Sequence, residues 1–268
     1  MTTPKITVVA GTLGSGKTTW IFQQIASNNH KYPYNKTLYY SPGTGKLPID
    51  QTRIASECPG VKVFHDGEEA EFLNQINSAL SIYIEIGFYL ELATISKILP
   101  NNQPYQAIGV LPPHLKDKDS DLHQWASEII SGASVHDTIY NIDNSTQIWR
   151  VPLSGEVIDE DSLVEFWYEV TNGAYGNVTR AKGIFDVNDG RSLYTEYVAG
   201  LPPTGLFELD LTRNLEGRPK RFSGLEVIGS KLDEVTLGQT LQDCLLSEAA
   251  IGQYQEQVKQ VLSEGIEE

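Results

Sequence analysis

Lys5-Ile-Thr-Val-Val-Ala-Gly-Thr-Leu-Gly-Ser-Gly-Lys-Thr18 is the stretch that decides the fold, because a strand pattern runs directly into a glycine-rich loop. β-branched residues dominate positions 5–10, and no glycine or proline interrupts positions 17–26, which predicts a strand before the loop and a helix after it. The pattern Gly-x-x-x-x-Gly-Lys-Ser/Thr is met from Gly11 to Thr18, in the strand-to-helix setting that a phosphate-binding loop requires. The stretch therefore predicts a loop that cradles the phosphates of a nucleotide, and the alternative is a glycine-rich connection without a ligand.

The chemistry expected of this loop follows from its residue types. Glycines let the backbone curl so that several N–H groups point at one anion, and the positive end of the following helix adds to this attraction. Lys17 is expected to reach the outer phosphates and to assist catalysis, and the Thr18 hydroxyl is expected to bind Mg²⁺. The predicted cofactor is GTP or ATP with Mg²⁺, and the predicted binding residues are Gly11, Gly14, Ser15, Gly16, Lys17, Thr18 and Thr19.

Hydrolysis would also need a carboxylate near the metal ion. Glu85 closes an apolar strand pattern over residues 81–86, and the carboxyl edge of a parallel sheet is where a nucleotide lies. We therefore predict Glu85 as a metal-binding and catalytic residue, the alternative being a solvent-facing acid at a strand end. Asp50 is a second candidate metal ligand, in a stretch that we expect to be a loop able to cover the phosphates.

The first half of the chain alternates strand and helix patterns. Such alternation favours an α/β fold with a mostly parallel sheet, and we assign residues 1–145 to this nucleotide-binding domain. Strands are expected over residues 5–10, 37–41, 61–64, 81–86 and 106–111, and helices over residues 17–26, 68–79 and 121–130.

The second half, residues 146–268, predicts a smaller α+β domain after a polar linker at residues 141–146. Its hairpin is signalled by Asp189 and Gly190 between two strand patterns. Its aromatic residues favour a core, with a partner-binding face as the alternative, and Arg180 and Lys182 alternate on one strand face, where an acidic partner or the nucleotide domain could meet them. Strands are expected over residues 147–152, 178–187, 192–198 and 222–228, helices over 159–169 and 234–246, and a solvated helix end over 254–268.

Composition narrows the possible partners and compartment. The chain has 268 residues and a formal charge of −15, which repels nucleic acid and anionic membranes. No stretch approaches eighteen apolar residues, and no leader pattern precedes the first strand, so we expect a cytoplasmic protein without membrane insertion. Only Cys58 and Cys244 are present, which provides neither a disulfide framework nor a cysteine-clustered metal site. The oligomeric state stays open.

Several stretches together resemble the CobW-like branch of the P-loop GTPases, a family linked to metal insertion and metal homeostasis. The likeness lies in the loop from Gly11 to Thr19, in the expected loop with Asp50, in Glu85-Ile-Gly87 and in the second half, above all in the stretches 152–159, 178–183 and 225–233. It implies a nucleotide domain followed by a smaller α+β domain, and a GTPase that acts as a chaperone for a client or partner protein.

The departures from that family matter as much. Its Cys-x-Cys-Cys metal signature is replaced by Val61-Lys-Val-Phe-His-Asp-Gly-Glu-Glu69, where His65, Asp66, Glu68 and Glu69 are weak substitutes and a solvated acidic helix start is the favoured interpretation. A bound transition metal is therefore doubtful. The switch-loop Asn-Glu pair is replaced near residues 41–43. The guanine-reading Asn-Lys-x-Asp is also missing, since residues 116–121 have no asparagine before the lysine, which leaves GTP against ATP open.

Three hypotheses remain. The first is a weak GTPase or NTPase that assists assembly of a client protein, and the second is a non-catalytic adaptor that nucleotide stabilises and that binds a partner through the second domain. The third is metal delivery through non-thiolate ligands.

Overall fold

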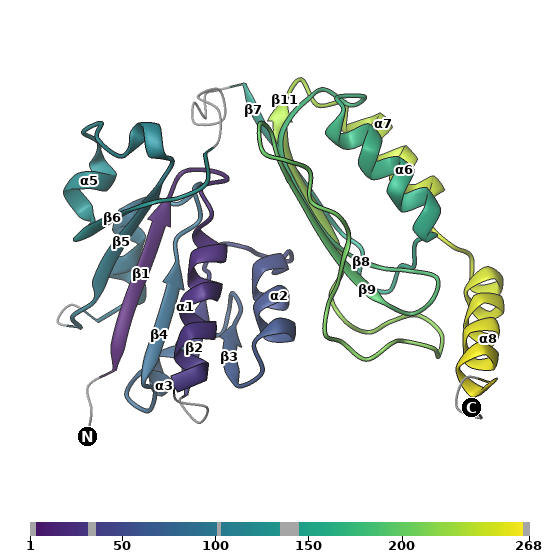
Figure 1. Ribbon diagram of the computed structural model, residues 1–268, viewed down its shortest axis with the longest axis horizontal. Coiled ribbons are helices and arrows are strands. Elements are labelled where there is room, and N and C mark those ends of the chain that lie inside the picture. Colours follow the sequence, from purple (N-terminus) through teal and green to yellow (C-terminus); the bar gives the residue numbers. More distant parts are fainter. Residues whose placement is uncertain (1–3, 32–35, 101–102, 135–144, 265–268) are drawn as a thin grey trace. The chain divides into compact units, whose positions relative to one another are not determined.

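The computed structural model describes residues 4–31, 36–100, 103–134 and 145–264, and the chain divides into two compact units, residues 1–140 and 141–268. Figure 1 shows the order of the elements within each unit. The predicted domain boundary at residue 145 stays a prediction, because it adjoins residues 135–144, which lie outside the described part. Among the described residues, no helix combines the length and the apolar character needed to cross a membrane.

The first unit is an α/β unit built on a six-stranded sheet in the order β3-β2-β4-β1-β5-β6, and every neighbouring pair is parallel. This confirms the predicted fold class. The elements in chain order are β1 (Lys5–Gly11), α1 (Lys17–Lys31), β2 (Thr37–Tyr40), α2 (Ile49–Glu57), β3 (Val61–Phe64), α3 (Glu69–Ile76), β4 (Ser81–Glu85), η1 (Leu92–Thr94), α4 (Ile95–Ile98), β5 (Gln106–Leu111), η2 (Pro113–Leu115), α5 (Asp121–Trp125) and β6 (Glu128–Ser131).

Two expectations for this unit were wrong. Asp50 does not lie in a loop: it stands in the first turn of α2, where its carboxylate complements the helix dipole. The helix expected over residues 121–130 ends at Trp125, and residues 128–131 form the edge strand β6. There the β-branched Ile129 and Ile130 pair in parallel with β5, and pairing with a neighbouring strand outweighs the local helix pattern.

The sheet of the first unit is buried on both faces, which is usual for parallel sheets. Adjacent tyrosines of β2 point to opposite faces: Tyr40 packs with Phe64 and Phe72, whereas Tyr39 packs with Ile21 and Ile25 of α1. Tyr39 therefore lies on the face that α1 covers.

The second unit is an α+β unit with an antiparallel five-stranded sheet in the order β10-β9-β8-β11-β7. Helices α6 and α7 run along one face of this sheet (Figure 1), and the predicted β8–β9 hairpin is confirmed, with Gly190 at a φ of 85° in the turn. Its elements are β7 (Thr146–Pro152), α6 (Glu160–Thr171), β8 (Asn177–Asp186), β9 (Ser192–Val198), β10 (Phe207–Glu208), β11 (Gly224–Ser230), α7 (Glu234–Asp243) and α8 (Glu248–Glu264).

Most aromatic side chains of the second unit belong to its interior, as predicted. Phe166 and Tyr175 lie in the core cluster under the helices, and Trp149 and Trp167 pack against that cluster. Tyr168 on α6 and Phe207 on β10 are exceptions, with 68% and 52% of their surfaces exposed.

Candidate functional site

The glycine loop joins the end of β1 to the start of α1, and two of its glycines adopt backbone angles that favour glycine. Gly14 has a φ of 68° and Gly16 a φ of 90°. At Gly11 the constraint is steric, because a Cβ atom there would lie 2.2 Å from the carbonyl oxygen of Val110 on β5. The path of the loop between β1, β5 and α1 thus requires glycine at these three positions.

The loop is supported by the chain that leaves β6. The backbone N–H of Ala133 donates to the carbonyl of Ser15 at 3.0 Å, and a Cβ on Gly132 would lie 2.1 Å from that same oxygen. Sequence reasoning missed Gly132 and Ala133, because strand β6 itself was assigned to a helix. The available signal was a small Gly-Ala pair after two isoleucines.

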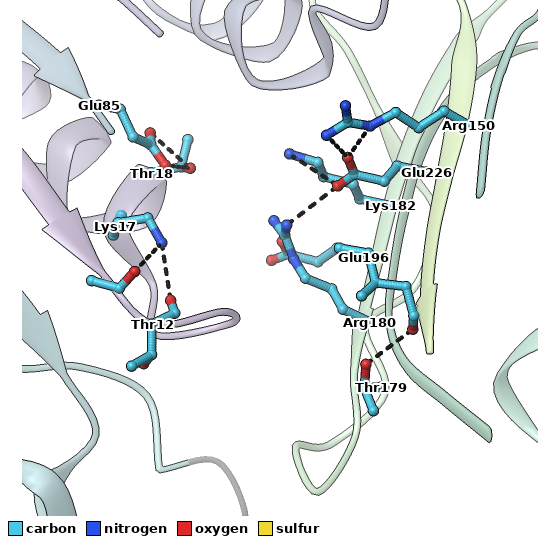
Figure 2. A network of polar contacts seen from close by, with 12 residues as sticks. Thr12, Lys17, Thr18, Glu85, Arg150, Thr179, Arg180, Lys182, Glu196 and Glu226 are labelled. Atoms are coloured by element: carbon cyan, nitrogen blue, oxygen red, sulfur yellow. Dashed lines mark hydrogen bonds and ion pairs between the residues drawn. The ribbon is translucent and has the colours of Figure 1, made fainter. Parts of the chain in front are cut away.

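Lys17 lies over the loop it belongs to. Its Nζ donates to the carbonyl oxygens of Gly11 at 3.1 Å and of Thr12 at 2.9 Å, as Figure 2 shows. The ammonium group is largely buried. It is therefore already at the mouth of the loop, where the motif predicts phosphate oxygens.

Thr18 and Glu85 meet directly behind the loop. The Thr18 hydroxyl donates to the Glu85 carboxylate, with Oγ1 at 2.9 Å from Oε1 and 3.0 Å from Oε2 (Figure 2). Glu85, at the carboxyl end of β4, is only 5% exposed, so the alternative of a solvent-facing acid is wrong. Because the hydroxyl donates its hydrogen bond to the carboxylate, the lone pairs of its oxygen remain available for a cation.

Tyr39, which sequence reasoning did not single out, completes this group. Its phenolic hydroxyl donates to Glu85 Oε2 at 2.8 Å, and the ring is fully buried. Burial, followed by the charges of Glu85 and Asp50, raises the pKa of Tyr39 well above its ordinary value. Asp50 thus acts on this group through its charge, while its role as a metal ligand stays a prediction.

The residues 41–45 that follow β2 are tied to the same edge of the sheet. Gln51 Nε2 donates to the Ser41 carbonyl at 2.9 Å and to Thr44 Oγ1 at 2.8 Å. The Asp66 carboxylate accepts the backbone N–H groups of Gly43 and Gly45 at 2.8 and 2.6 Å. This stretch, where the family's switch-loop pair is missing, is thus held from both α2 and the end of β3.

The acidic stretch after β3 is occupied with local hydrogen bonds. Glu68 Oε2 accepts the backbone N–H of His65 at 2.7 Å, and Glu69 Oε1 accepts from Gly67 N–H at 3.1 Å and from the Tyr40 hydroxyl at 3.0 Å. The Gly67 hydrogen bond is the main reason that the pKa of Glu69 is lowered. Within the described ranges, no three His, Cys, Asp or Glu residues gather as a metal site.

The residues that replace the guanine-reading motif form an exposed stretch. Residues 116–120 lie between η2 and α5, Asp121 begins α5, and all of them are exposed. The imidazole of His123 contacts the Lys116 carbonyl oxygen at 2.6 Å. The choice between GTP and ATP therefore stays open.

The residues at the loop fit a magnesium–nucleotide complex. Two buried hydroxyl groups of the loop, Thr12 Oγ1 and Ser15 Oγ, have no hydrogen-bond partner among the described residues. Buried polar groups are rarely left so, and phosphate oxygens would supply acceptors for both. The Thr18 hydroxyl and the Glu85 carboxylate are hard oxygen donors of the kind that Mg²⁺ prefers, directly or through water.

Comparison with known proteins gives only distant structural likenesses. No protein-family model and no curated protein matches the sequence. A crystal structure of the Zn(II)-bound YjiA GTPase from E. coli matches at a TM-score of 0.32 and 14% identity, over 91% of this chain and 99% of that chain. A Zn(II)-bound triple mutant of the same GTPase matches at 0.32 and 12%. FlhF complexed with GMPPNP and Mg²⁺ matches at 0.31 and 16%, over 41% of this chain and 45% of that chain.

Proposed function

We propose that this chain binds a purine nucleoside triphosphate with Mg²⁺ and hydrolyses it slowly. The observation that carries the proposal is the Thr18–Glu85 hydrogen bond, which sets a hydroxyl and a carboxylate directly behind the glycine loop. A cytoplasmic location belongs to the same proposal and is supported by two free, buried cysteines in the described part of the chain.

Different residues of the chain bind the phosphates and the metal ion in this proposal. Backbone N–H groups of the loop and the start of α1 receive the phosphate oxygens, and Lys17 turns its ammonium group from the loop carbonyls toward them. Glu85 holds the Thr18 hydroxyl, and these two groups would hold Mg²⁺, directly or through water. When bound, Mg²⁺ neutralises the charge on the outer phosphates.

Beyond nucleotide binding, we propose that the nucleotide cycle assists the assembly or metal loading of a client protein. The support is the resemblance of the loop and of three stretches of the second unit to the CobW-like family.

A non-catalytic adaptor is the second candidate, and one feature of α6 favours it. Val164 and Tyr168, one helical turn apart, are 51% and 68% exposed, so α6 offers an apolar strip to a partner.

The test is a titration of the purified chain with fluorescent GTP and ATP, with Mg²⁺ or with EDTA, followed by phosphate release on the same sample. Lys17→Ala is the test variant, and Lys5→Ala, an exposed lysine at the opposite end of β1, is the matched control for loss of one charge. Binding that Lys17→Ala weakens and Lys5→Ala leaves intact supports the proposal. Absence of binding to both nucleotides would overturn it, and tight binding without phosphate release would favour the adaptor.

A further inference from the structure

We propose that Tyr39 is the positioning residue of the metal site: its hydroxyl fixes the Glu85 carboxylate, which in turn holds the Thr18 hydroxyl. The inference rests on the proposed function, because it assigns a role in Mg²⁺ binding. It adds a residue that neither the loop motif nor the family resemblance marks.

The sheet brings the three groups together. β2 and β4 are parallel neighbours, with Tyr39 opposite Tyr83, so the carboxyl ends of both strands meet at one edge. Tyr39 points to the sheet face that α1 covers, and Thr18 stands in the first turn of α1. The phenol therefore reaches Glu85 from within the core, and the threonine reaches it from the start of α1.

The direction of the hydrogen bonds is fixed by chemistry. An ionised carboxylate only accepts, so both the Tyr39 and the Thr18 hydroxyls donate to Glu85. The Oε2 atom is shared, because it lies 2.8 Å from the Tyr39 oxygen and 3.0 Å from the Thr18 oxygen. Rotation of the carboxylate about its last side-chain bond would break the bond to Tyr39.

This restraint matters for metal binding because Thr18 has one proton to give. While Glu85 is held in place, the Thr18 hydroxyl donates its hydrogen bond to the carboxylate, and the lone pairs of its oxygen point away from Glu85. Without the phenol, the carboxylate can rotate and the threonine hydroxyl is no longer fixed. Loss of a group that orients a metal ligand typically lowers metal affinity by about 10- to 100-fold.

The chain contains a matched control one residue away. Tyr40 is also buried, and its hydroxyl also donates to a carboxylate, Glu69 Oε1 at 3.0 Å, but it lies on the opposite face of the sheet. Tyr40→Phe therefore removes the same atom from the same strand without touching the metal site.

The experiment measures the Mg²⁺ concentration that gives half-maximal binding of fluorescent GTP and of fluorescent ATP to the full chain. We expect Tyr39→Phe to raise that concentration by about 10- to 100-fold. Nucleotide affinity in EDTA should stay at the wild-type value, and Tyr40→Phe should titrate like the wild type. In a Glu85→Gln background, Tyr39→Phe should have little further effect, because the phenol acts through that carboxylate.

The outcomes separate this inference from the proposed function. A wild-type chain that binds no nucleotide would overturn both. Nucleotide binding with the same Mg²⁺ dependence in Tyr39→Phe and the wild type would overturn only the role of Tyr39, as would an equal shift in Tyr40→Phe. Thermal unfolding in EDTA is the companion measurement. If the unfolding temperature falls in Tyr39→Phe but not in Tyr40→Phe, the Tyr39 hydroxyl serves stability instead of metal binding.

Discussion

Among the described residues, Glu85 in the first unit and Glu226 in the second are buried glutamates on interior strands, and their hydrogen-bond and ion-pair partners differ in kind. Glu85 on β4 and Glu226 on β11 are both only 5% exposed. Glu226 is surrounded by charge: Arg150 lies 2.7 Å away, Arg180 3.5 Å and Lys182 4.0 Å (Figure 2). Glu85 instead accepts hydrogen bonds from the neutral hydroxyls of Thr18 and Tyr39.

Sheet topology explains this difference. In the antiparallel sheet, Arg150 and Lys182 stand directly opposite Glu226 on the two neighbouring strands, so charges pair across one row. In the parallel sheet, all strands end at one edge, where a carboxylate meets loops and a helix start. The neutral donors on Glu85 position its carboxylate at the edge where an added cation would bind, whereas the three cations around Glu226 give that carboxylate a structural role.

The charges around Glu226 also decide its protonation. Burial alone would raise the pKa of this carboxyl group, but Lys182, Arg180 and Arg150 outweigh burial and hold the pKa below its ordinary value.

The largest expected effect is that of Glu226→Gln on stability. The substitution leaves three cations around a neutral side chain, and breaking a buried ion network costs about 3 to 5 kcal/mol. Denaturant unfolding followed by tryptophan fluorescence measures the loss. The control is Glu208→Gln, whose ion pair with Arg213 at 3.9 Å is exposed and is worth less than about 1 kcal/mol. Equal effects of the two variants would contradict the structural role of Glu226.

Much of the fold could be predicted because hydrophobic periodicity is local. The predicted strands at residues 61–64, 106–111 and 192–198 match the structure residue for residue. Helix α2 was not predicted because Pro48, directly before its first residue, is typical of a turn. Strand β6 was not predicted because its pairing with β5 depends on residues distant in the sequence.

The same distinction holds for the candidate site. The glycine loop is contiguous, so its sequence alone predicts its shape. Tyr39 is indistinguishable in sequence from its neighbour Tyr40, and only the pairing of β2 with β4 brings it to Glu85, 46 positions away. Gly132 is likewise recognisable only once β6 places it against Ser15.

Gly132→Ala tests whether the glycine loop tolerates an added methyl group where the chain leaving β6 contacts it. The new methyl group would lie 2.1 Å from the Ser15 carbonyl oxygen, so the backbone of the loop must move. We expect a loss of about 1 to 3 kcal/mol in the stability of the first unit, as for other overpacked sites, together with weaker nucleotide binding. Gly205→Ala is the control, because nothing lies within 4 Å of its added methyl group. Unchanged nucleotide affinity in Gly132→Ala would show that the loop tolerates displacement.

The stability of the second unit is expected to depend on pH through Asp186. This buried carboxylate pairs with Arg221, whereas Glu226 lies near three cations. Burial raises the pKa of Asp186 to about 6, although Arg221 Nε lies 2.6 Å from its Oδ1 and opposes this shift. The folded protein therefore takes up a proton at a higher pH than the unfolded chain does. The contribution of Asp186 to stability is full below pH about 4 and is lost as the pH rises through about 6.

Comparison with Asp186→Asn isolates this contribution from that of the other carboxylates. Between pH 7 and pH 5, wild-type stability should rise relative to that of the variant by about 1 kcal/mol. Denaturant unfolding at both pH values provides the measurement. A difference that does not depend on pH would mean that one cation suffices to keep Asp186 ionised.

Glu85→Gln has the smallest expected effect on stability and the most direct bearing on the comparison. The amide oxygen can still accept hydrogen bonds from the Thr18 and Tyr39 hydroxyls, which are both neutral donors. We expect unfolding in EDTA to change by less than about 1 kcal/mol, against the much larger loss in Glu226→Gln. Nucleotide binding should nevertheless lose its dependence on Mg²⁺, because the negative charge that attracts the metal is gone. A large destabilisation of Glu85→Gln in EDTA, with Mg²⁺ dependence intact, would place Glu85 in the same structural class as Glu226.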